Sequence, residues 1–247
     1  MAERPRKKRA RSALFAPAAF LLICGALIFA LSVFFRVNTV AVTGNSVYTD
    51  EEIVEASGIE AGDNLCFINR FTAVNRIYSR LPYVEQADIQ RSLPNQLVIR
   101  VTESSAVAVV SAESGLWVID RSCKLLARAE GDEGAHLIRV EGLTPIAPEV
   151  GQIIAPGEAE TPKVAYLSAL LRQISDLGLQ GDVTRIDMSS AANPSFDYLG
   201  RFTVKLGAYE NVEYKFQCLL SAVATLPEGD RGTLDLSIDK RAHLTYD

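Results

Sequence analysis

The chain has 247 residues, of which 48% are hydrophobic and 22% charged, a composition typical of folded globular proteins and not of wholly disordered ones. Its net charge of −5 is unevenly distributed, because residues 1–12 carry +5 and the rest of the chain carries −10. An acidic body argues against nucleic-acid binding, since phosphate contacts need Lys and Arg.

A basic segment precedes a long uncharged run at the start of the chain. Residues Ser12–Phe35 carry no charge, and as a helix these 24 residues would reach about 36 Å, enough for a bilayer core of about 30 Å. The run predicts a transmembrane helix at 13–35, since the apolar region of a cleaved signal peptide usually has only about 7–15 residues. Because cations flank the cytoplasmic side of a span, residues 1–12 are expected in the cytoplasm and residues 36–247 outside it. The residues expected to set this orientation are Arg6, Lys7, Lys8, Arg9 and Arg11.

The residues that follow show the pattern of a small α+β domain. A β-branched strand around Val40 ends at Gly44. Thr49 and Glu52 then have the spacing of a capping box, which predicts the start of a short helix. Gly58 is expected to end this helix, because glycine accepts the left-handed conformation that follows many helices.

A second helix is predicted near Arg70–Leu81, and Pro82 ends it. Two strands follow around a turn at residues 93–95. The order β-α-α-β-β predicts one sheet with both helices on one face. The apolar face of the second helix is expected to consist of Phe71, Val74, Tyr78 and Leu81.

The pattern of residues 105–247 predicts a second domain, which contains both helices and strands. Strands are expected around Trp117 and at 183–188 and 202–206. Helices are expected at residues 163–177 and around Lys215. The first of these helices would bury Val164, Leu167, Leu171, Ile174 and Leu177, and the second Val212, Phe216, Leu219, Leu220 and Val223. A closing strand from Gly232 would place Leu234, Leu236 and Ile238 on one face and Thr233, Asp235, Ser237 and Asp239 on the other.

Motifs of catalysis and metal binding are missing from the sequence. The chain has two histidines, His136 and His243, and contains no Cys-x-x-Cys, His-Glu-x-x-His, Gly-x-Ser-x-Gly or phosphate-binding glycine loop. We therefore expect no catalytic centre, cofactor or metal site and no small-molecule substrate. The cysteines, which are Cys24, Cys66, Cys123 and Cys218, are predicted to be buried apolar thiols.

Two stretches carry a resemblance to a known family. They read "RVNTVAVTGNSVYTDEEIVEASGIEAGDNLCFIN" and "LPYVEQADIQRSLPNQLVIRVTE", and together they resemble a POTRA domain of the FtsQ/DivIB cell-division family. Later stretches, "WVIDRSCKLLAR" and "VKLGAYENVEYKFQCLLSAV", are similar to the second domain of that family. The resemblance implies an α+β chain with one transmembrane helix, a POTRA domain at 36–104 and a β-domain at 105–247 that ends in an edge strand.

The resemblance also implies a function. Proteins of this family are non-catalytic scaffolds at the division septum of the plasma membrane. They dock other membrane-anchored division proteins, chiefly FtsB/DivIC-like and FtsL-like coiled coils, and help recruit or regulate septal peptidoglycan synthesis. The alternatives are a membrane-anchored cell-wall enzyme and a POTRA-type transport or assembly component, which would show tandem POTRA copies or a barrel.

The closing strand is the candidate site for a partner. On its residues alone the strand could be interior or at an edge, where unpaired backbone groups can bind another chain. The resemblance implies the edge, with the helix that carries Lys215 beside it. The expected partner-binding residues are Thr233, Asp235, Ser237, Asp239, Lys215, Tyr209, Tyr214 and Tyr246.

Overall fold

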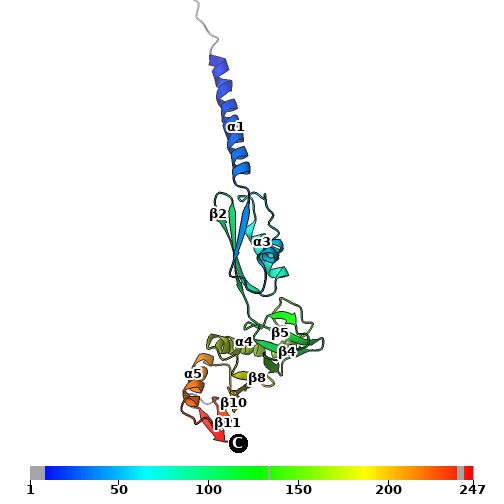
Figure 1. The fold of residues 1–247 in the computed structure, drawn as a ribbon, viewed down its shortest axis with the longest axis vertical. Helices are drawn as coiled ribbons and strands as arrows, with labels where there is room; N and C mark the ends of the chain where they lie inside the picture. Colours follow the sequence, from blue (N-terminus) through cyan, green and yellow to red (C-terminus); the bar gives the residue numbers. More distant parts are fainter. Residues whose placement is uncertain (1–8, 133, 238–241, 247) are drawn as a thin grey trace, which may run out of the picture. The chain divides into compact units, whose positions relative to one another are not determined.

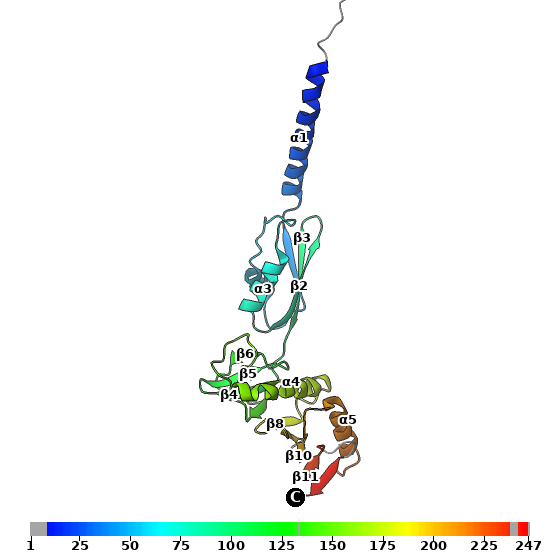
Figure 2. The same cartoon turned by 180° about the vertical axis from the view of Figure 1, so that it is seen from behind.

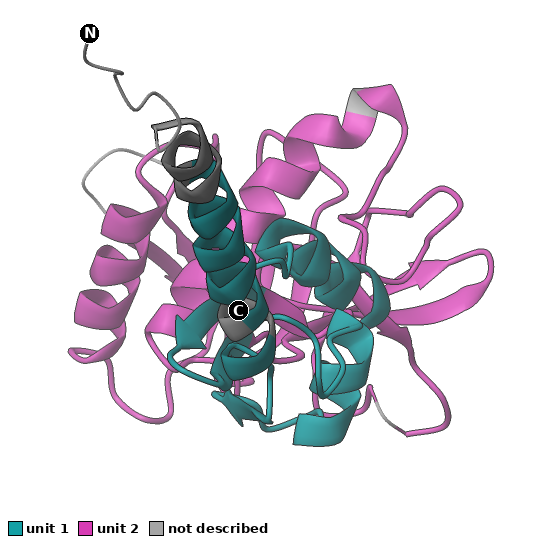
Figure 3. Cartoon of the chain, turned by 90° about the horizontal axis from the view of Figure 1, so that it is seen from above, with its two compact units in different colours: residues 1–80, 86–102 teal, residues 81–85, 103–247 magenta. Residues whose placement is uncertain are grey.

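The computed structural model describes residues 9–132, 134–237 and 242–246. The chain forms two compact units, Met1–Arg80 with Gln86–Thr102 and Leu81–Glu85 with Glu103–Asp247 (Figure 3). Each unit has its own sheet, and the two are described separately.

The first unit begins with helix α1 (Arg9–Phe34), which contains Pro17. Among the residues that the structure describes, no helix combines the length and the hydropathy needed to cross a membrane. Of the residues predicted to set the orientation, Arg9 and Arg11 belong to α1, while Arg6, Lys7 and Lys8 lie outside the described residues.

The rest of the first unit confirms the order β-α-α-β-β. Its elements are β1 (Thr39–Thr43), α2 (Asp50–Ser57), α3 (Arg70–Arg80), β2 (Val84–Ser92) and β3 (Gln96–Glu103) (Figure 1). The three strands form a sheet in the order β1-β3-β2, and β1 runs parallel to β3. Fully buried Ile53 and Ile77 from the two helices and Leu97 and Ile99 from β3 contribute to its core.

Helix α2 begins and ends as the sequence predicts. The Glu52 amide donates to Thr49 Oγ1 at 3.3 Å, and the Thr49 amide donates to Glu52 Oε2 at 2.8 Å, so both halves of the capping box are formed. Gly58 ends the helix with a left-handed φ of 67°. The capping arrangement satisfies amide groups that the first helical turn leaves without intrahelical partners.

The predicted apolar face of α3 is wrong at Phe71 and Tyr78, whereas Leu81, just after the helix, is buried as predicted and Val74 is half-buried. The helix buries Ala73 and Ile77, whereas Phe71 is 75% and Tyr78 40% exposed. Ala73 and Ile77 are four residues apart and therefore share one face of the helix. The small side chain of Ala73 lets this face pack closely. Phe71 and Tyr78 lie on other faces, although their spacing also fits a helical stripe.

The second unit contains a nine-stranded sheet in the order β12-β11-β10-β9-β8-β7-β4-β5-β6. Its central strands β4, β7 and β8 are parallel, and antiparallel pairs flank them. The strand bounds are β4 (Ala108–Ala112), β5 (Gly115–Ile119), β6 (Leu125–Arg128), β7 (Ile138–Glu141), β8 (Val183–Asp187), β9 (Ser195–Tyr198), β10 (Phe202–Lys205), β11 (Gly232–Asp235) and β12 (His243–Tyr246). Three residues, Glu158–Glu160, form a short 3-10 turn before α4.

Two helices supply much of the core of the second unit. Helix α4 (Thr161–Asp176) buries Tyr166, Leu167, Leu170, Leu171 and Ile174, and α5 (Val212–Val223) buries Val212, Phe216 and Leu219. The expected stripe of α4 is therefore wrong at its end, because Leu177 follows the helix and is 42% exposed. The Phe216 ring stacks on Phe196 of β9, with 5.6 Å between the ring centroids, which fixes α5 against the sheet.

The closing strand is two strands and not one. Strand β11 ends at Asp235, whose Oδ1 accepts a hydrogen bond from the Ser237 amide at 2.8 Å, and the chain then returns as β12. Because β12 pairs antiparallel with β11, and β11 also pairs with β10, the strand that carries Thr233 and Asp235 is interior. The short turn made by Asp235 interrupts the polar–apolar alternation, which had predicted a strand that continues past residue 237.

The cysteines also differ from the expectation. Cys123 is buried, and burial raises the pKa of its thiol, but Cys66 is exposed, and Cys24 and Cys218 are half-buried. Trp117 is 8% exposed and donates to Ser114 Oγ at 2.9 Å, so it packs as an apolar strand residue would.

Candidate partner-binding site

The two outer strands of the nine-stranded sheet differ in how they are covered. The segment 151–154 bonds to the start of β6, because the Leu125 amide donates to Gln152 O at 2.8 Å and the Gly151 amide donates to Leu125 O at 2.7 Å. The Ile154 amide donates to Cys123 O at 2.9 Å, just before the strand, and extends this contact. At the opposite end, β12 is the outermost strand, and no strand of the described residues pairs with its outer side.

The pairing pattern shows which backbone groups of β12 point outward. The amides of Gly232 and Leu236 donate to Arg201 O and Lys205 O, so even-numbered residues of β11 bond toward β10. Backbone groups alternate along a strand, so the odd-numbered residues bond toward β12. Because Thr233 lies opposite Thr245, and Asp235 opposite His243, the remaining residues of β12 face outward. These outward-facing residues are Leu244 and Tyr246.

Strand β12 is held close to β11 by a glycine. Gly232 lies opposite Tyr246 with a φ of 145°, and a Cβ at this position would collide with the backbone oxygen of Thr245. The Tyr246 hydroxyl contacts Asp230 Oδ2 at 3.3 Å, and the side chain is 63% exposed. Tyr246 therefore combines an outward backbone with an accessible aromatic ring, which is a side chain enriched at interaction hot spots.

The turn after β10 is the second part of the candidate site. The hydroxyl of Tyr166 donates to Gly207 O at 3.1 Å and approaches Ala208 O at 3.3 Å. Lys215 Nζ donates to Ala208 O at 2.7 Å. The Tyr209 ring lies 4.9 Å from that of Tyr166, between centroids, and the Tyr209 side chain remains 54% exposed. Buried and charged groups thus hold the turn that presents Tyr209.

Gly207 also connects this turn to the end of β11. It has a φ of 68°, and a Cβ added to it would lie 2.7 Å from Ser237 Cβ, so the two backbones approach closely. The predicted residues Tyr209, Lys215 and Ser237 are therefore brought together at one end of α5. Burial of the Tyr166 hydroxyl raises its pKa, so Tyr166 stays neutral at physiological pH and remains a hydrogen-bond donor.

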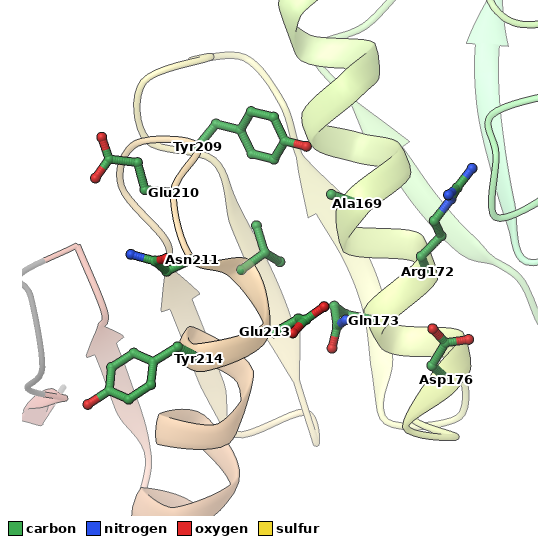
Figure 4. Close-up of a pocket in the computed structure, with 10 residues that line it drawn as sticks. Ala169, Arg172, Gln173, Asp176, Tyr209, Glu210, Asn211, Glu213 and Tyr214 are labelled. Carbon is green, nitrogen blue, oxygen red and sulfur yellow. The ribbon is translucent and has the colours of Figure 1, made fainter.

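A cavity of about 680 Å³ lies between α4 and the start of α5. Figure 4 shows Arg172, Gln173 and Asp176 on α4 on one side of the cavity, with Glu213 pointing toward Gln173 from α5. Tyr214 points away from α4 and is 44% exposed. The lining is rich in polar and charged groups, which suits a polar or charged segment of another chain better than an apolar ligand.

Within the described residues, the structure shows no group of three or more His, Cys, Asp and Glu side chains placed to hold a metal ion. The buried carboxylate of Asp120 has a structural role, because it accepts hydrogen bonds from the Ser104 hydroxyl at 2.9 Å and from the amides of Ser122 at 2.7 Å and Lys124 at 2.9 Å. His136 and His243 are exposed and lie far apart in the sequence.

The structure places the predicted partner-binding residues in three groups. Tyr209, Lys215 and Ser237 surround the turn after β10, with Tyr214 nearby on α5. Tyr246 lies on the edge strand, whereas Thr233 and Asp235 lie on the interior strand β11. Asp239 lies outside the described residues. The residues that the sequence reasoning missed are Leu244, Arg172, Gln173 and Asp176, and the alternation in "HLTY" is the one signal that points to Leu244.

Comparison with known proteins shows which proteins this chain is similar to. Residues 35–104 match the family model of the POTRA domain, FtsQ-type. Over 208 residues the chain is 25% identical to cell division protein DivIB of Clostridium acetobutylicum, which covers 83% of this chain and 80% of the relative. It is 31% identical to DivIB of Clostridium tetani over 121 residues, which is 49% of this chain and 45% of the relative.

A relative from another group of bacteria gives the same result. The chain is 25% identical over 211 residues to cell division protein FtsQ of Streptomyces coelicolor, which covers 84% of this chain and 71% of the relative. The resemblance drawn from the sequence is therefore confirmed along most of the chain. Over most of its length the chain is therefore similar to the FtsQ and DivIB cell division proteins, and its residues 35–104 match the POTRA domain of the FtsQ type.

Proposed function

We propose that the chain is a non-catalytic scaffold of the cell-division machinery. It docks other membrane-anchored division proteins outside the cytoplasm and helps recruit or regulate septal peptidoglycan synthesis. The names of its relatives support a role in division. The observation that carries the docking role is the contrast between β6, whose first residue is bonded by segment 151–154, and β12, whose outward backbone groups have no partner strand among the described residues.

The proposal includes an anchored topology. Residues 13–35 span the plasma membrane, 1–12 stay in the cytoplasm, and 36–104 and 105–247 form the POTRA domain and the β-domain outside it. The charge pattern supports this orientation, because Lys and Arg gather at the cytoplasmic side of a span. Anchoring confines the chain to a surface shared with its partners and so raises their effective concentration. A reporter fused to the C-terminus that is active only outside the cytoplasm tests the topology, and a cytoplasmic C-terminus contradicts it.

The proposed partners are FtsB/DivIC-like and FtsL-like coiled-coil membrane proteins. An extended segment of such a partner adds to β12 as a further strand and bonds to the outward groups of Leu244 and Tyr246. Backbone bonds then supply affinity, and side chains beside the strand supply specificity. Tyr209, Tyr214, Lys215 and the exposed ring of Tyr246 are the residues proposed to contact the partner next to this strand.

A pair of substitutions at one residue tests strand addition. Tyr246→Ala removes the aromatic ring but keeps the backbone N–H, whereas Tyr246→Pro also removes the N–H that points outward. Recovery of the coiled-coil partners with the full chain from solubilised membranes is expected to fall with Ala and to fall much further with Pro. Equal recovery with Ala and Pro contradicts backbone pairing, because the N–H would then make no contribution.

The division role has a separate test. Depletion of the chain is expected to give filaments without septa, and the Tyr246→Pro chain is expected to restore septa poorly although it is present at normal levels. Normal septa after depletion contradict the proposal. Turnover of a cell-wall substrate by the purified chain would show an enzyme, and the His136→Ala and His243→Ala variants then identify whether either histidine is required.

A further inference from the structure

Two large apolar side chains stand exposed on neighbouring loops of the first unit. Phe67 is 85% exposed in the loop that leads into α3, and Leu93 is 67% exposed in the turn between β2 and β3. We call this pair the apolar tip. Large apolar side chains that are exposed together usually mark a surface that binds a partner or a membrane.

Backbone hydrogen bonds tie both loops to the residues that directly follow α1. The Leu65 amide donates to Phe35 O at 2.7 Å, and the Val37 amide donates to Asp63 O at 2.8 Å. On the other side, the Asn38 amide donates to Asn95 O at 2.8 Å. Phe67 is therefore two residues from Leu65, and Leu93 is two residues from Asn95. Both Leu65 and Asn95 are bonded to the segment 35–38. Figure 2 shows the β2–β3 turn at the end of the three-stranded sheet where this segment enters.

An arginine joins the two loops and adds positive charge between them. Arg91, which lies two residues before Leu93, donates from Nη2 to Ile68 O at 2.9 Å and to Cys66 O at 3.4 Å. Arg36 forms a β-bridge with Asn64 on the same loop. The guanidinium of Arg91 therefore lies beside the apolar tip, and the backbone of Arg36 pairs with the same loop. Apolar side chains with cationic residues next to them suit the boundary between the acyl chains and the phosphate groups of a bilayer.

We propose that the apolar tip rests in the surface of a phospholipid bilayer, with Phe67 and Leu93 among the acyl-chain boundary and Arg36 and Arg91 at the lipid phosphates. This inference depends on the proposed membrane anchor. Phe35 is the last residue of the uncharged run, so if the run leaves the bilayer there, the hydrogen bond from Leu65 holds the loop at the lipid surface. The contact would limit how far the POTRA domain tilts away from the membrane, because the domain would be attached at its chain entry and also at two loops.

Three versions of the full chain, each with one labelled cysteine, in bilayers of phosphatidylethanolamine and phosphatidylglycerol test the proposal. A nitroxide spin label is attached to native Cys66, beside Phe67, to native Cys24, within the uncharged run, or to a Val47→Cys variant. The other cysteines are replaced, except Cys123, which is fully buried. Val47 is 54% exposed and follows β1, so the five residues of the strand, about 17 Å in length, separate it from segment 35–38. It is the matched control at the other end of the sheet.

The measurement compares collisions of each label with oxygen, which concentrates in lipid, and with a water-soluble nickel complex. Labels at Cys66 and Cys24 are expected to favour oxygen, and the label at Val47→Cys is expected to favour nickel. A lipid-exposed Cys24 label together with a water-exposed Cys66 label overturns the inference and leaves the anchor intact. A water-exposed Cys24 label overturns the anchor, and the proposal about the tip then fails with it.

A charge placed in the apolar tip gives a second, independent readout. With both Phe67→Asp and Leu93→Asp, the label at Cys66 is expected to move into water, because carboxylates are expelled from the acyl-chain boundary. A Val47→Asp variant, also at an exposed site, is expected to leave the Cys66 label in lipid. An unchanged Cys66 label in the double variant contradicts a contact made through the two apolar side chains.

Discussion

The two outer strands of one sheet have opposite surroundings. Segment 151–154 forms backbone hydrogen bonds to the first residue of β6, and Leu125 and Leu126 of β6 are buried. Strand β12 carries Tyr246 at 63% exposure and directs the backbone of Leu244 and Tyr246 outward. An uncovered edge invites pairing with other chains, and proteins generally protect such edges. The edge at β6 is protected in that way, and the edge at β12 is available. Pairing with another chain can therefore be specific to the β12 side of the domain.

Removing the cover of β6 is expected to have the largest effect. Ile154 is 4% exposed in the main core, and Ile154→Ala should lower the free energy of unfolding by about 2–5 kcal/mol. The loosened segment should also uncover β6 and cause self-association that increases with concentration. Urea unfolding and light scattering measure the two effects. Ile153 is 59% exposed, so Ile153→Ala is the control and should change stability by less than about 0.5 kcal/mol. Similar losses for both variants would contradict the covering role.

Detaching β12 should have the next largest effect. In Gly232→Ala the new Cβ collides with Thr245 O at a φ of 145°, and strain of this kind costs about 1–3 kcal/mol. Hydrogen exchange in residues 243–246 is expected to accelerate, and recovery of the coiled-coil partners should fall. Gly229→Ala is the control, because a Cβ there meets nothing within 4 Å. Unchanged exchange in Gly232→Ala would show that β12 does not depend on this close approach.

Loosening the turn after β10 should have a smaller effect. Tyr166→Phe removes the buried hydroxyl that donates to Gly207 O, which should cost about 1 kcal/mol in urea unfolding. Tyr209→Phe changes an exposed side chain and should stay within about 0.5 kcal/mol. Proteolysis of the turn is expected to accelerate only in the Tyr166 variant. Equal stability of both variants would mean that the buried hydroxyl does not hold the turn.

The smallest effect is expected for the pH dependence of stability that comes from Asp235 at the end of β11. Partial burial acts to raise the pKa of the Asp235 carboxyl, but hydrogen bonds from Ser237 outweigh it. Nearby Lys205 and His243 lower the pKa further, so it lies below its ordinary value. A lowered pKa in the folded state stabilises the chain above the unfolded pKa of about 4, and this contribution is lost as the pH falls through the folded pKa.

Asp235→Asn removes that contribution, so the variant should lose less stability than the original chain between about pH 5 and pH 3. Thermal unfolding across this range measures the difference. Asp88, an exposed aspartate of the first unit, provides the control substitution Asp88→Asn. Parallel pH profiles for the original chain and Asp235→Asn would contradict the lowered pKa.

Local signals in the sequence predicted the first unit well. The capping box of Thr49 and Glu52 and the glycine at 58 determine α2 through contacts within a few residues, and such contacts can be read without the fold. The inward face of α3 could not be read in this way. Phe71 and Ala73 both fit helical stripes, and which one is buried depends on the space beside the sheet.

The candidate site was predicted only in part. Alternation of polar and apolar residues extends from Gly232 past Ser237, so one long strand was expected. The hydrogen bond from the Ser237 amide to Asp235 ends that strand, and the pairing of Gly232 with Tyr246 creates the edge. The cavity between α4 and α5 is lined by residues about forty positions apart in the sequence, such as Arg172 and Glu213. No local sequence pattern predicts that two such distant residues lie together.

The most direct test of the docking surface is amide exchange at single residues of β12, with and without the coiled-coil partners. In the free chain, Thr245, which bonds toward β11, should exchange slowly, while Leu244 and Tyr246 exchange fast. Bound partners should slow Leu244 and Tyr246 and leave Thr245 little changed. Slow exchange of all three residues in the free chain, or no slowing of Leu244 and Tyr246 on binding, would contradict the proposal that β12 accepts a further strand.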